Sequence, residues 1–178
     1  MDTISFPSFP IGVCDHGHWD AGRFFRRLNE CNRLARTHDF RFFTVSDLQG
    51  FEDAVNAAQD TQAFLCVSDI SDGMLQLENT PHSREVKTIF MAMRHSAQTA
   101  DTANIRARCL EIMRELFRQF MSVLARERTC IIEHGIILDP NIQFSEIPKY
   151  FLTGCACAYF QITVVDYRDH SFNPEEWL

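Results

Sequence analysis

The longest regular pattern of hydrophobic and polar positions in this chain lies between residues 105 and 124 and has the period of an α-helix. Apolar side chains recur there at steps of three and four, and charged side chains occupy the opposite side. The apolar positions are Ile105, Cys109, Ile112, Met113, Leu116, Phe117, Phe120, Val123 and Leu124. A start near Thr102, with Asp101 as the capping residue, predicts a helix of about 24 residues and about 36 Å. We expect Leu116 and Phe120 to lie beneath a sheet.

Shorter patterns on both sides of this helix predict two further helices and several strands. Asp20 to His38 has one apolar face and is expected to be a single helix, and Ser46 is expected to cap a short helix that runs to Ala58. The predicted strands are Phe40–Val45, Ala63–Val67, Met74–Leu77, Glu85–Met93, Cys130–Ile132, Ile136–Leu138 and Cys155–Tyr167, with an extended path from Ile142 to Ile147. Met74–Leu77 follows a turn at Ser71-Asp72-Gly73 and is expected to return as a hairpin partner. Cys155–Tyr167 is expected to be the longest strand.

The order of these elements is helix, strands, long helix, strands, with connections short enough for antiparallel pairing throughout. This order predicts an α+β fold in which the helices, among them an N-terminal helix and one long central helix, all pack on one face of an antiparallel β-sheet. A chain of 178 residues usually forms one domain with a substantial core. We therefore expect a single α+β domain over residues 20–168, between an N-terminal arm of residues 1–19 and a C-terminal arm of residues 169–178.

Both arms contain more large apolar side chains than a solvated chain end needs. The residues concerned are Phe6, Phe9, Ile11 and Trp19 in the N-terminal arm and Phe172, Trp177 and Leu178 in the C-terminal arm. Leaving such side chains in water forfeits roughly 1.5–3 kcal/mol for each one that could be buried. The arms are therefore expected to dock, either on their own domain or on a neighbour. We predict that at least one arm packs on a neighbouring subunit or on an adjoining ring of another protein, with these residues as candidate interface anchors.

The composition is that of a globular protein, with 46% hydrophobic and 23% charged residues. No apolar run is long enough for a membrane span, and the first residues lack the basic and apolar segments of a secretion signal. A formal net charge of −7 disfavours general nucleic-acid binding. The five arginines between residues 20 and 38 are better explained as a solvated helix face than as a nucleic-acid patch. We therefore expect no membrane partner and no general nucleic-acid binding.

Two groups of residues have the composition of a metal or acid–base site. Cys14, His16 and His18 offer soft ligands for zinc, but no convincing fourth ligand accompanies them, and we expect no metal there. Asp69 and Asp72 flank a predicted turn, and turn chemistry explains them without a cation. Motifs for phosphate loops, dinucleotide binding or metalloprotease zinc do not occur. No cofactor and no metal site is therefore predicted.

Seven cysteines, an odd number, predict free thiols in a reducing compartment. Four of them lie in apolar surroundings and are expected in the core, namely Cys66, Cys109, Cys155 and Cys157. Cys155 and Cys157 are too far apart for an undistorted disulfide. Cys130 with His134 has the composition of a nucleophile and a base, but no motif frames the pair. No catalytic residue is predicted, and the chain is expected not to be an enzyme.

The order and texture of several segments resemble the small tail-terminator and tail-completion proteins of tailed bacteriophages and the related neck proteins. The segments are FRFFTV, AFLCVS, VKTIFMAM, IRARCLEIMRELFRQFMSVL and YFLTGCACAYFQITVVDY, which follow an N-terminal helix within residues 20–167. The resemblance implies a helix-flanked sheet and a hexameric ring that caps the tail tube at the head–tail junction. It implies no catalytic residues, because a ring protein needs self-complementary surfaces and not convergent polar groups.

The resemblance also implies a set of partners and a location. The partners are other copies of the chain, the tail tube protein, neck or connector proteins, and genomic DNA that passes through the ring without sequence-specific binding. The location is the virion, after assembly in the cytoplasm of the bacterial host. A negative net charge suits a conduit whose wall does not grip DNA. Two other classes remain as alternatives: a non-enzymatic interaction or adaptor protein of a mobile element and, less favoured, a cysteine- or metal-dependent enzyme.

Overall fold

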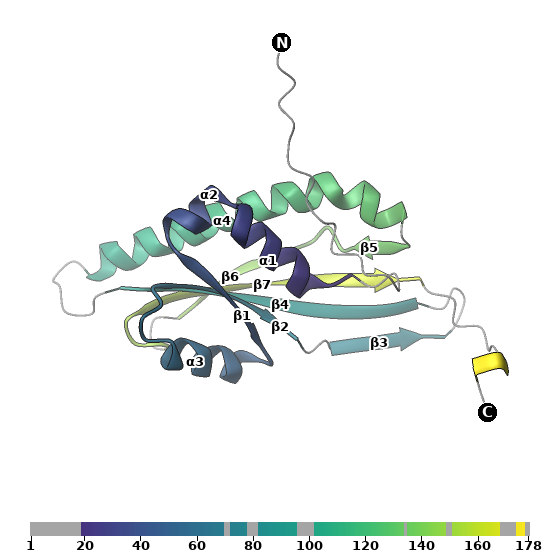
Figure 1. The fold of residues 1–178 in the computed structure, drawn as a ribbon, viewed down its shortest axis with the longest axis horizontal. Coiled ribbons are helices and arrows are strands. Elements are labelled where there is room, and N and C mark those ends of the chain that lie inside the picture. Colours follow the sequence, from purple (N-terminus) through teal and green to yellow (C-terminus); the bar gives the residue numbers. More distant parts are fainter. Residues whose placement is uncertain are drawn as a thin grey trace, which may run out of the picture.

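A seven-stranded sheet forms the centre of the protein, and helices lie on both of its faces (Figure 1). The computed structural model describes residues 19–69, 72–77, 82–95, 102–133, 135–148, 151–167 and 174–176. Its helices are α1 (Ala21–Cys31), α2 (Arg33–Thr37), α3 (Leu48–Ala57), α4 (Thr102–Glu133) and the short 3-10 helix η1 (Pro174–Glu176). Its strands are β1 (Phe40–Val45), β2 (Ala63–Ser68), β3 (Asp72–Gln76), β4 (His82–Arg94), β5 (Ile136–Leu138), β6 (Phe144–Ile147) and β7 (Cys155–Asp166). The predicted α+β class is confirmed.

The strand order across the sheet is β1-β2-β4-β7-β5, and two short strands extend its edges. β3 continues beyond β2 along the same edge of β4, and β6 shares the outer edge of β7 with β5. Among the described strands, every neighbouring pair is antiparallel except β1 and β2, which are parallel. The prediction of an antiparallel sheet is wrong for this one pair, because α3 carries the chain from the end of β1 back to its start.

The helices cover the two faces of the sheet unequally. α1, α2 and α4 lie on one face, which we call the helical face, and α3 alone lies on the other, which we call the α3 face (Figure 1). The prediction that the helices pack on one face is wrong for α3, because its Phe51 stacks on Phe90 of β4 with 5.0 Å between ring centroids. α3 has only ten residues and covers one end of its face. Among the described helices, none covers the other end of the α3 face.

The long helix α4 has 32 residues and is longer than predicted. Leu116 and Phe120 are buried in the main core, as predicted. The predicted strand Cys130–Ile132 is wrong, because these residues belong to the last turns of α4. Ile131 is buried and lies two helical turns after Leu124, on the same side of the helix. A three-residue apolar run fits a helix face as well as a strand, so the sequence pattern alone did not decide this segment.

The expected single helix from Asp20 to His38 is divided into two by Asn32. The Asn32 side-chain oxygen accepts a hydrogen bond from the amide of Ala35 at 2.9 Å and thereby caps the start of α2. Its side-chain nitrogen donates to Gln119 Oε1 on α4 at 2.8 Å. The break therefore turns the chain toward β1 and ties the helix pair to the long helix.

The predicted cap of α3 is wrong, and the predicted cap of α4 is not among the described residues. α3 is capped by Asp47, whose carboxylate accepts a hydrogen bond from the amide of Gly50 at 2.8 Å, and not by Ser46. A carboxylate at this position also interacts favourably with the positive end of the helix dipole. The expected cap of α4, Asp101, lies outside the described residues.

The strands β3 and β4 form a hairpin that reaches past α3 (Figure 1). β3 begins at Asp72, within the predicted turn, and its partner is the first half of β4 rather than the preceding strand β2. β4 has 13 residues and β7 has 12, so the prediction that Cys155–Tyr167 is the longest strand is wrong. The extra length of β4 is what carries the hairpin beyond the helix.

Candidate functional site

The hairpin exposes large apolar side chains that sequence patterning did not single out. Met74, Leu75 and Leu77 are 55%, 52% and 69% exposed. Met74 lies opposite Arg84 and Leu75 lies opposite Ser83, so these two apolar side chains point to opposite faces of the hairpin. β3 pairs with β4 along one edge, and no other described strand pairs with its second edge. The hairpin therefore offers apolar groups on both faces beside a row of backbone groups that can pair with another chain.

The open end of the α3 face is a second candidate surface. Two hollows, of about 370 and 200 Å³, lie beside the start of α3 and share Leu48, Thr88 and Phe90. Leu48 is 45% exposed, and Ile137 on β5, paired with Val165 on the same face, is 37% exposed. Leu48 lines both hollows and Ile137 lines neither, so the α3 face offers two separate exposed apolar side chains to a partner.

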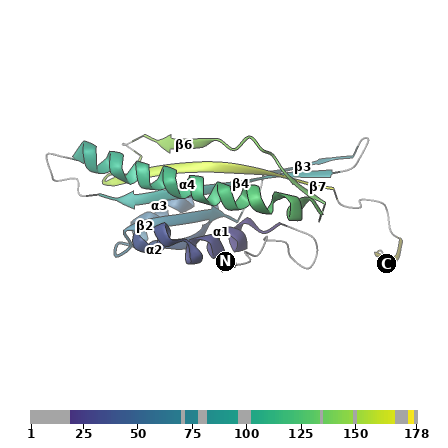
Figure 2. The ribbon, with the colours of Figure 1, turned by 90° about the horizontal axis from the view of Figure 1, so that it is seen from above.

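An apolar groove of about 350 Å³ lies between the second half of α4 and the segment that joins β5 to β6. Figure 2 shows α4 running along the sheet, with β6 on one side and α1 and α2 on the other. Phe117 and Leu124 line the groove from α4, Ile142 lines it from the joining segment, and Arg128 and Asp139 contribute charge. The ring of Phe117 continues into the core, where it lies 5.0 Å from Phe160. The groove is thus shallow and floored by core side chains.

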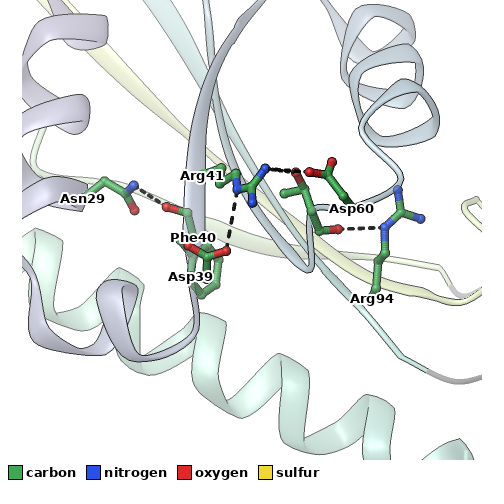
Figure 3. A network of polar contacts seen from close by, with 7 residues as sticks. Asn29, Asp39, Phe40, Arg41, Asp60 and Arg94 are labelled. Atoms are coloured by element: carbon green, nitrogen blue, oxygen red, sulfur yellow. Dashed lines mark hydrogen bonds and ion pairs between the residues drawn. The ribbon is translucent and has the colours of Figure 1, made fainter.

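Arg94 lies at one end of a polar network near the C-terminal end of α3 (Figure 3). Its Nε donates to the carbonyl of Thr61 at 2.8 Å. A terminal nitrogen of the same guanidinium donates to the carbonyls of Val55 and Ala58, at the C-terminal end of α3. The carbonyl of Val55 has no partner within the helix, and the arginine supplies its donor. The carbonyl of Ala58 also accepts a hydrogen bond from the amide of Thr61, at 3.1 Å. Arg94 also lies over the ring of Phe64, at 5.4 Å.

The remaining contacts in Figure 3 hold the start of β1. Arg41 forms ion pairs with Asp39 and Asp60, at 3.6 and 3.2 Å. The buried Asn29 donates from its side chain to the carbonyl of Phe40 at 2.6 Å. Each of these polar groups binds a backbone atom or a neighbouring exposed charge, which gives the network a structural role.

The buried thiols are poor nucleophiles. Burial raises the pKa of Cys66 and the pKa of Cys157 to about 12. Burial also raises the pKa of Cys109 and of Cys155. Because the thiolate is the reactive form, these cysteines behave as small core residues, as predicted. Cys31 is an exposed thiol.

We expect alkylation to separate Cys31 from the core thiols. In the folded protein at pH 8, iodoacetamide should modify Cys31 within minutes and leave Cys66 and Cys157 unmodified, because an unprotonated thiol is rare at a pH far below a pKa of about 12. Peptide mass spectrometry checks the result, and denaturation in urea should make all sites react. Modification of Cys66 in the native state at the rate of Cys31 would contradict the placement of the core.

The candidate metal and nucleophile groups fall mainly outside the described residues. This holds for the Cys14, His16 and His18 group, for His134 and for the side chain of Cys130. Asp69 is exposed just after β2, whereas the side chain of Asp72 is not described. Within the described part of the chain, no three His, Cys, Asp or Glu side chains lie together in a way that could hold a metal ion.

The predicted interface anchors separate into one buried residue and six residues outside the described part. Trp19 is only 7% exposed and packs on the rings of Phe24 and Phe25, at 5.5 and 6.4 Å between centroids. Its assignment as an interface anchor is therefore corrected: its side chain belongs to the core of its own domain, because the start of α1 brings three aromatic rings together. The other six, which lie outside the described residues, are Phe6, Phe9, Ile11, Phe172, Trp177 and Leu178.

Sequence patterning missed the hairpin surface for an identifiable reason. Met74 and Leu75 are adjacent, so an alternating strand must expose one of them unless both faces are covered. The adjacency of Met74 and Leu75 could have indicated this surface. It becomes informative only when one knows that no described helix or strand packs on either face of the hairpin.

Comparison with protein-family models and with curated proteins finds no match to this chain. Among the described helices, none combines the length and the apolar character needed to cross a lipid bilayer. The function must therefore be inferred from the fold and from the surfaces.

Proposed function

We propose that this chain is a structural protein of a tailed-bacteriophage virion that forms a ring, with hexameric stoichiometry, at the head–tail junction. In this role it caps the tail tube and joins the tail to the neck or connector. Its partners are further copies of itself, the tail tube protein and the neck proteins. Genomic DNA passes through the ring without sequence-specific contact. The ring assembles in the cytoplasm of the bacterial host and remains in the virion.

The architecture supports this proposal. The resemblance to tail-terminator proteins implies a sheet flanked by helices, and the protein has such a sheet, with α1 at the start of the fold and α4 along the sheet. Because one fold can serve many functions, the proposal depends on the surfaces more than on the architecture.

The apolar hairpin is the observation that carries the proposal. An exposed edge strand with large apolar side chains is a liability in a protein that acts as a monomer, and monomers usually blunt such edges with charge or cover them. β3 instead exposes Met74 and Leu75, and Leu77, directly after the strand, is exposed as well. The outer edge of the sheet at β5 and β6 lies on the opposite side of the strand order. Distinct surfaces on opposite sides suit head-to-tail contacts, which close into rings when the rotation between copies allows.

The decisive experiment is the oligomeric state of the purified protein, alone and with tails. Light scattering after size exclusion should give a multiple of the 20.6 kDa chain mass. Electron micrographs should show rings, and added tail tubes should carry them at one end. A stable monomer at high concentration that does not cap tail tubes would contradict the ring and would favour the adaptor class.

Variants of the hairpin test its part in the ring. Leu75→Glu combined with Leu77→Glu should raise the dissociation constant of the oligomer by at least about tenfold, because interface anchors typically contribute more than about 1 kcal/mol each. The free energy of unfolding of the monomer should change by less than about 0.5 kcal/mol, since both side chains are in solvent. Gln76→Glu adds charge to the same strand without removing apolar surface and serves as the control. Unchanged assembly of the double variant would remove the hairpin from the interface.

Truncation tests the two arms. Deleting residues 1–12 or, separately, residues 171–178 should leave circular dichroism and melting nearly intact while weakening assembly, because the apolar side chains there exceed what a chain end needs. Both deletions retain Trp19, whose ring belongs to the core. If one truncation unfolds the monomer, that arm belongs to the core of its own domain. If both truncated proteins assemble normally, the arms are not interface elements.

A further inference from the structure

Positive charge is concentrated on the exposed side of α1 and α2. The five arginines there are all exposed, namely Arg23, Arg26, Arg27, Arg33 and Arg36. Between residues 20 and 38 only Asp20 and Glu30 oppose them, in a chain whose net charge is −7. Arg27 forms an ion pair with Glu30, at 3.5 Å. We call this surface the basic face.

Negative charge is concentrated around α3. Residues 46–60 contain Asp47, Glu52, Asp53 and Asp60, and no lysine, arginine or histidine. Asp47, Asp53 and Asp60 are exposed, and Glu52 is partly exposed. Asp60 is paired with Arg41 of β1, so the net negative charge comes from Asp47, Glu52 and Asp53. The exposed Leu48 lies on the first turn of the same helix. We call this surface the acidic face.

The two charged faces cannot neutralise each other within one chain. α1 packs on β1 and β2 from the helical face, and α3 packs on β1 from the α3 face, so the sheet separates them (Figure 1). Within the described part of the chain, Arg33, Arg36 and Glu52 take part in no ion pair of their own. The basic face and the acidic face therefore lie at the same edge of the sheet, near β1, but on its two different faces.

We propose that the basic face of one copy binds the acidic face of a second copy of this chain. The inference rests on the proposed function, because it names the charged contact between neighbouring copies in the ring. Complementary charge on two different surfaces orients partners head to tail and suppresses face-to-face pairing of like charges. The exposed Leu48 adds an apolar group next to the charged contact. Duplex DNA is the other polyanion that arginines could hold, but DNA offers no role to the acidic face.

Charge reversal on each face gives a direct test. Variant A carries Arg33→Glu and Arg36→Glu, so both of its faces are acidic. Variant B carries Glu52→Lys and Asp53→Lys. Because Asp60 is already paired with Arg41, these two lysines then oppose Asp47 alone, so both faces of variant B are basic. Each variant alone should dissociate, with a dissociation constant raised at least about tenfold, because like charges then meet at every contact. An equimolar mixture of A and B should reassemble, since every contact between A and B again pairs opposite charges.

Controls separate the charged contact from general charge and folding effects. Arg108→Glu, on an exposed position of α4, changes charge in the same direction as variant A and should assemble normally. Circular dichroism and melting should show that variants A and B fold. Glu52→Gln combined with Asp53→Asn removes the same two negative charges as variant B without adding positive ones. Raising salt from about 0.1 to 1 M should weaken wild-type assembly, because the screening length falls from about 10 to 3 Å.

The outcomes distinguish this inference from the proposed function. A monomeric wild-type protein overturns both. If the wild type forms rings and variants A and B assemble equally well, only the charged contact is wrong. If A and B dissociate but their mixture does not reassemble, the two faces do not bind each other, and the inference is overturned. If a 40-base-pair duplex of random sequence binds the wild type and not variant A, while variant B assembles normally, the basic face serves nucleic acid instead.

Discussion

Phe120→Ala is expected to lower the free energy of unfolding by about 3–5 kcal/mol, the range for a large aromatic side chain removed from a well-packed core. Phe120 is 1% exposed and lies on the side of α4 that faces the sheet. Its ring is 5.9 Å from that of Phe25 on α1, so it joins the two helices that cover the helical face. Urea unfolding followed by circular dichroism measures the change.

Matched variants on the same helix check that this loss comes from the core. Leu116→Ala, also fully buried, should cost about 2–5 kcal/mol. Glu111→Ala, at an exposed position of α4, should change the free energy of unfolding by less than about 0.5 kcal/mol. A loss below about 0.5 kcal/mol for Phe120→Ala would mean that the helix is rotated and that its apolar stripe faces elsewhere.

The parts of the fold that the sequence predicted well are those specified by local periodicity. The stripe through Leu116 and Phe120 is long enough to fix both the helix and its buried side. The strands β1, β2 and β7 are apolar runs of the expected length, and they lie close to their predicted positions. In these segments each residue's position in the repeat determines which way its side chain points.

The parts that were missed depend on partners distant in sequence. Nothing local to Phe40–Val45 states that its neighbour will be parallel, since that depends on where α3 docks. From the sequence alone, Asn32 could lie inside a helix or cap one. Its contact with Gln119 on α4, which the sequence does not reveal, favours the cap. The two charged faces likewise become opposed surfaces only when the sheet lies between them. Candidate contact surfaces are therefore harder to predict from the sequence than the core.

Arg94→Met is the second substitution with a large expected effect, about 3 kcal/mol of lost unfolding free energy. The arginine donates to the carbonyls of Val55, Ala58 and Thr61, and methionine offers no donor. A hydrogen bond from a charged group contributes about 1.5–3 kcal/mol. The total stays near the value for one or two such bonds, because Arg94 is partly exposed and the Ala58 carbonyl keeps its bond from the amide of Thr61. Urea unfolding measures the total, and faster hydrogen exchange in α3 should show that the helix end frays.

Two further variants show whether the stabilisation by Arg94 requires the several donors of the guanidinium or only its positive charge. Arg94→Lys keeps the charge but cannot reach three carbonyls from one head group, so it should lose at least about half as much as Arg94→Met. Arg41→Met removes a neighbouring arginine whose partners are the exposed carboxylates of Asp39 and Asp60 and the hydroxyl of Thr61. Because the arginine and both carboxylates are exposed, the substitution should cost less than about 1 kcal/mol. Equal losses for Arg41→Met and Arg94→Met would show that capping of the α3 carbonyls contributes nothing beyond an ordinary surface ion pair. A larger loss confined to Arg94, together with local exchange in α3, identifies this side chain as the element that fastens the only helix on the α3 face among the described residues.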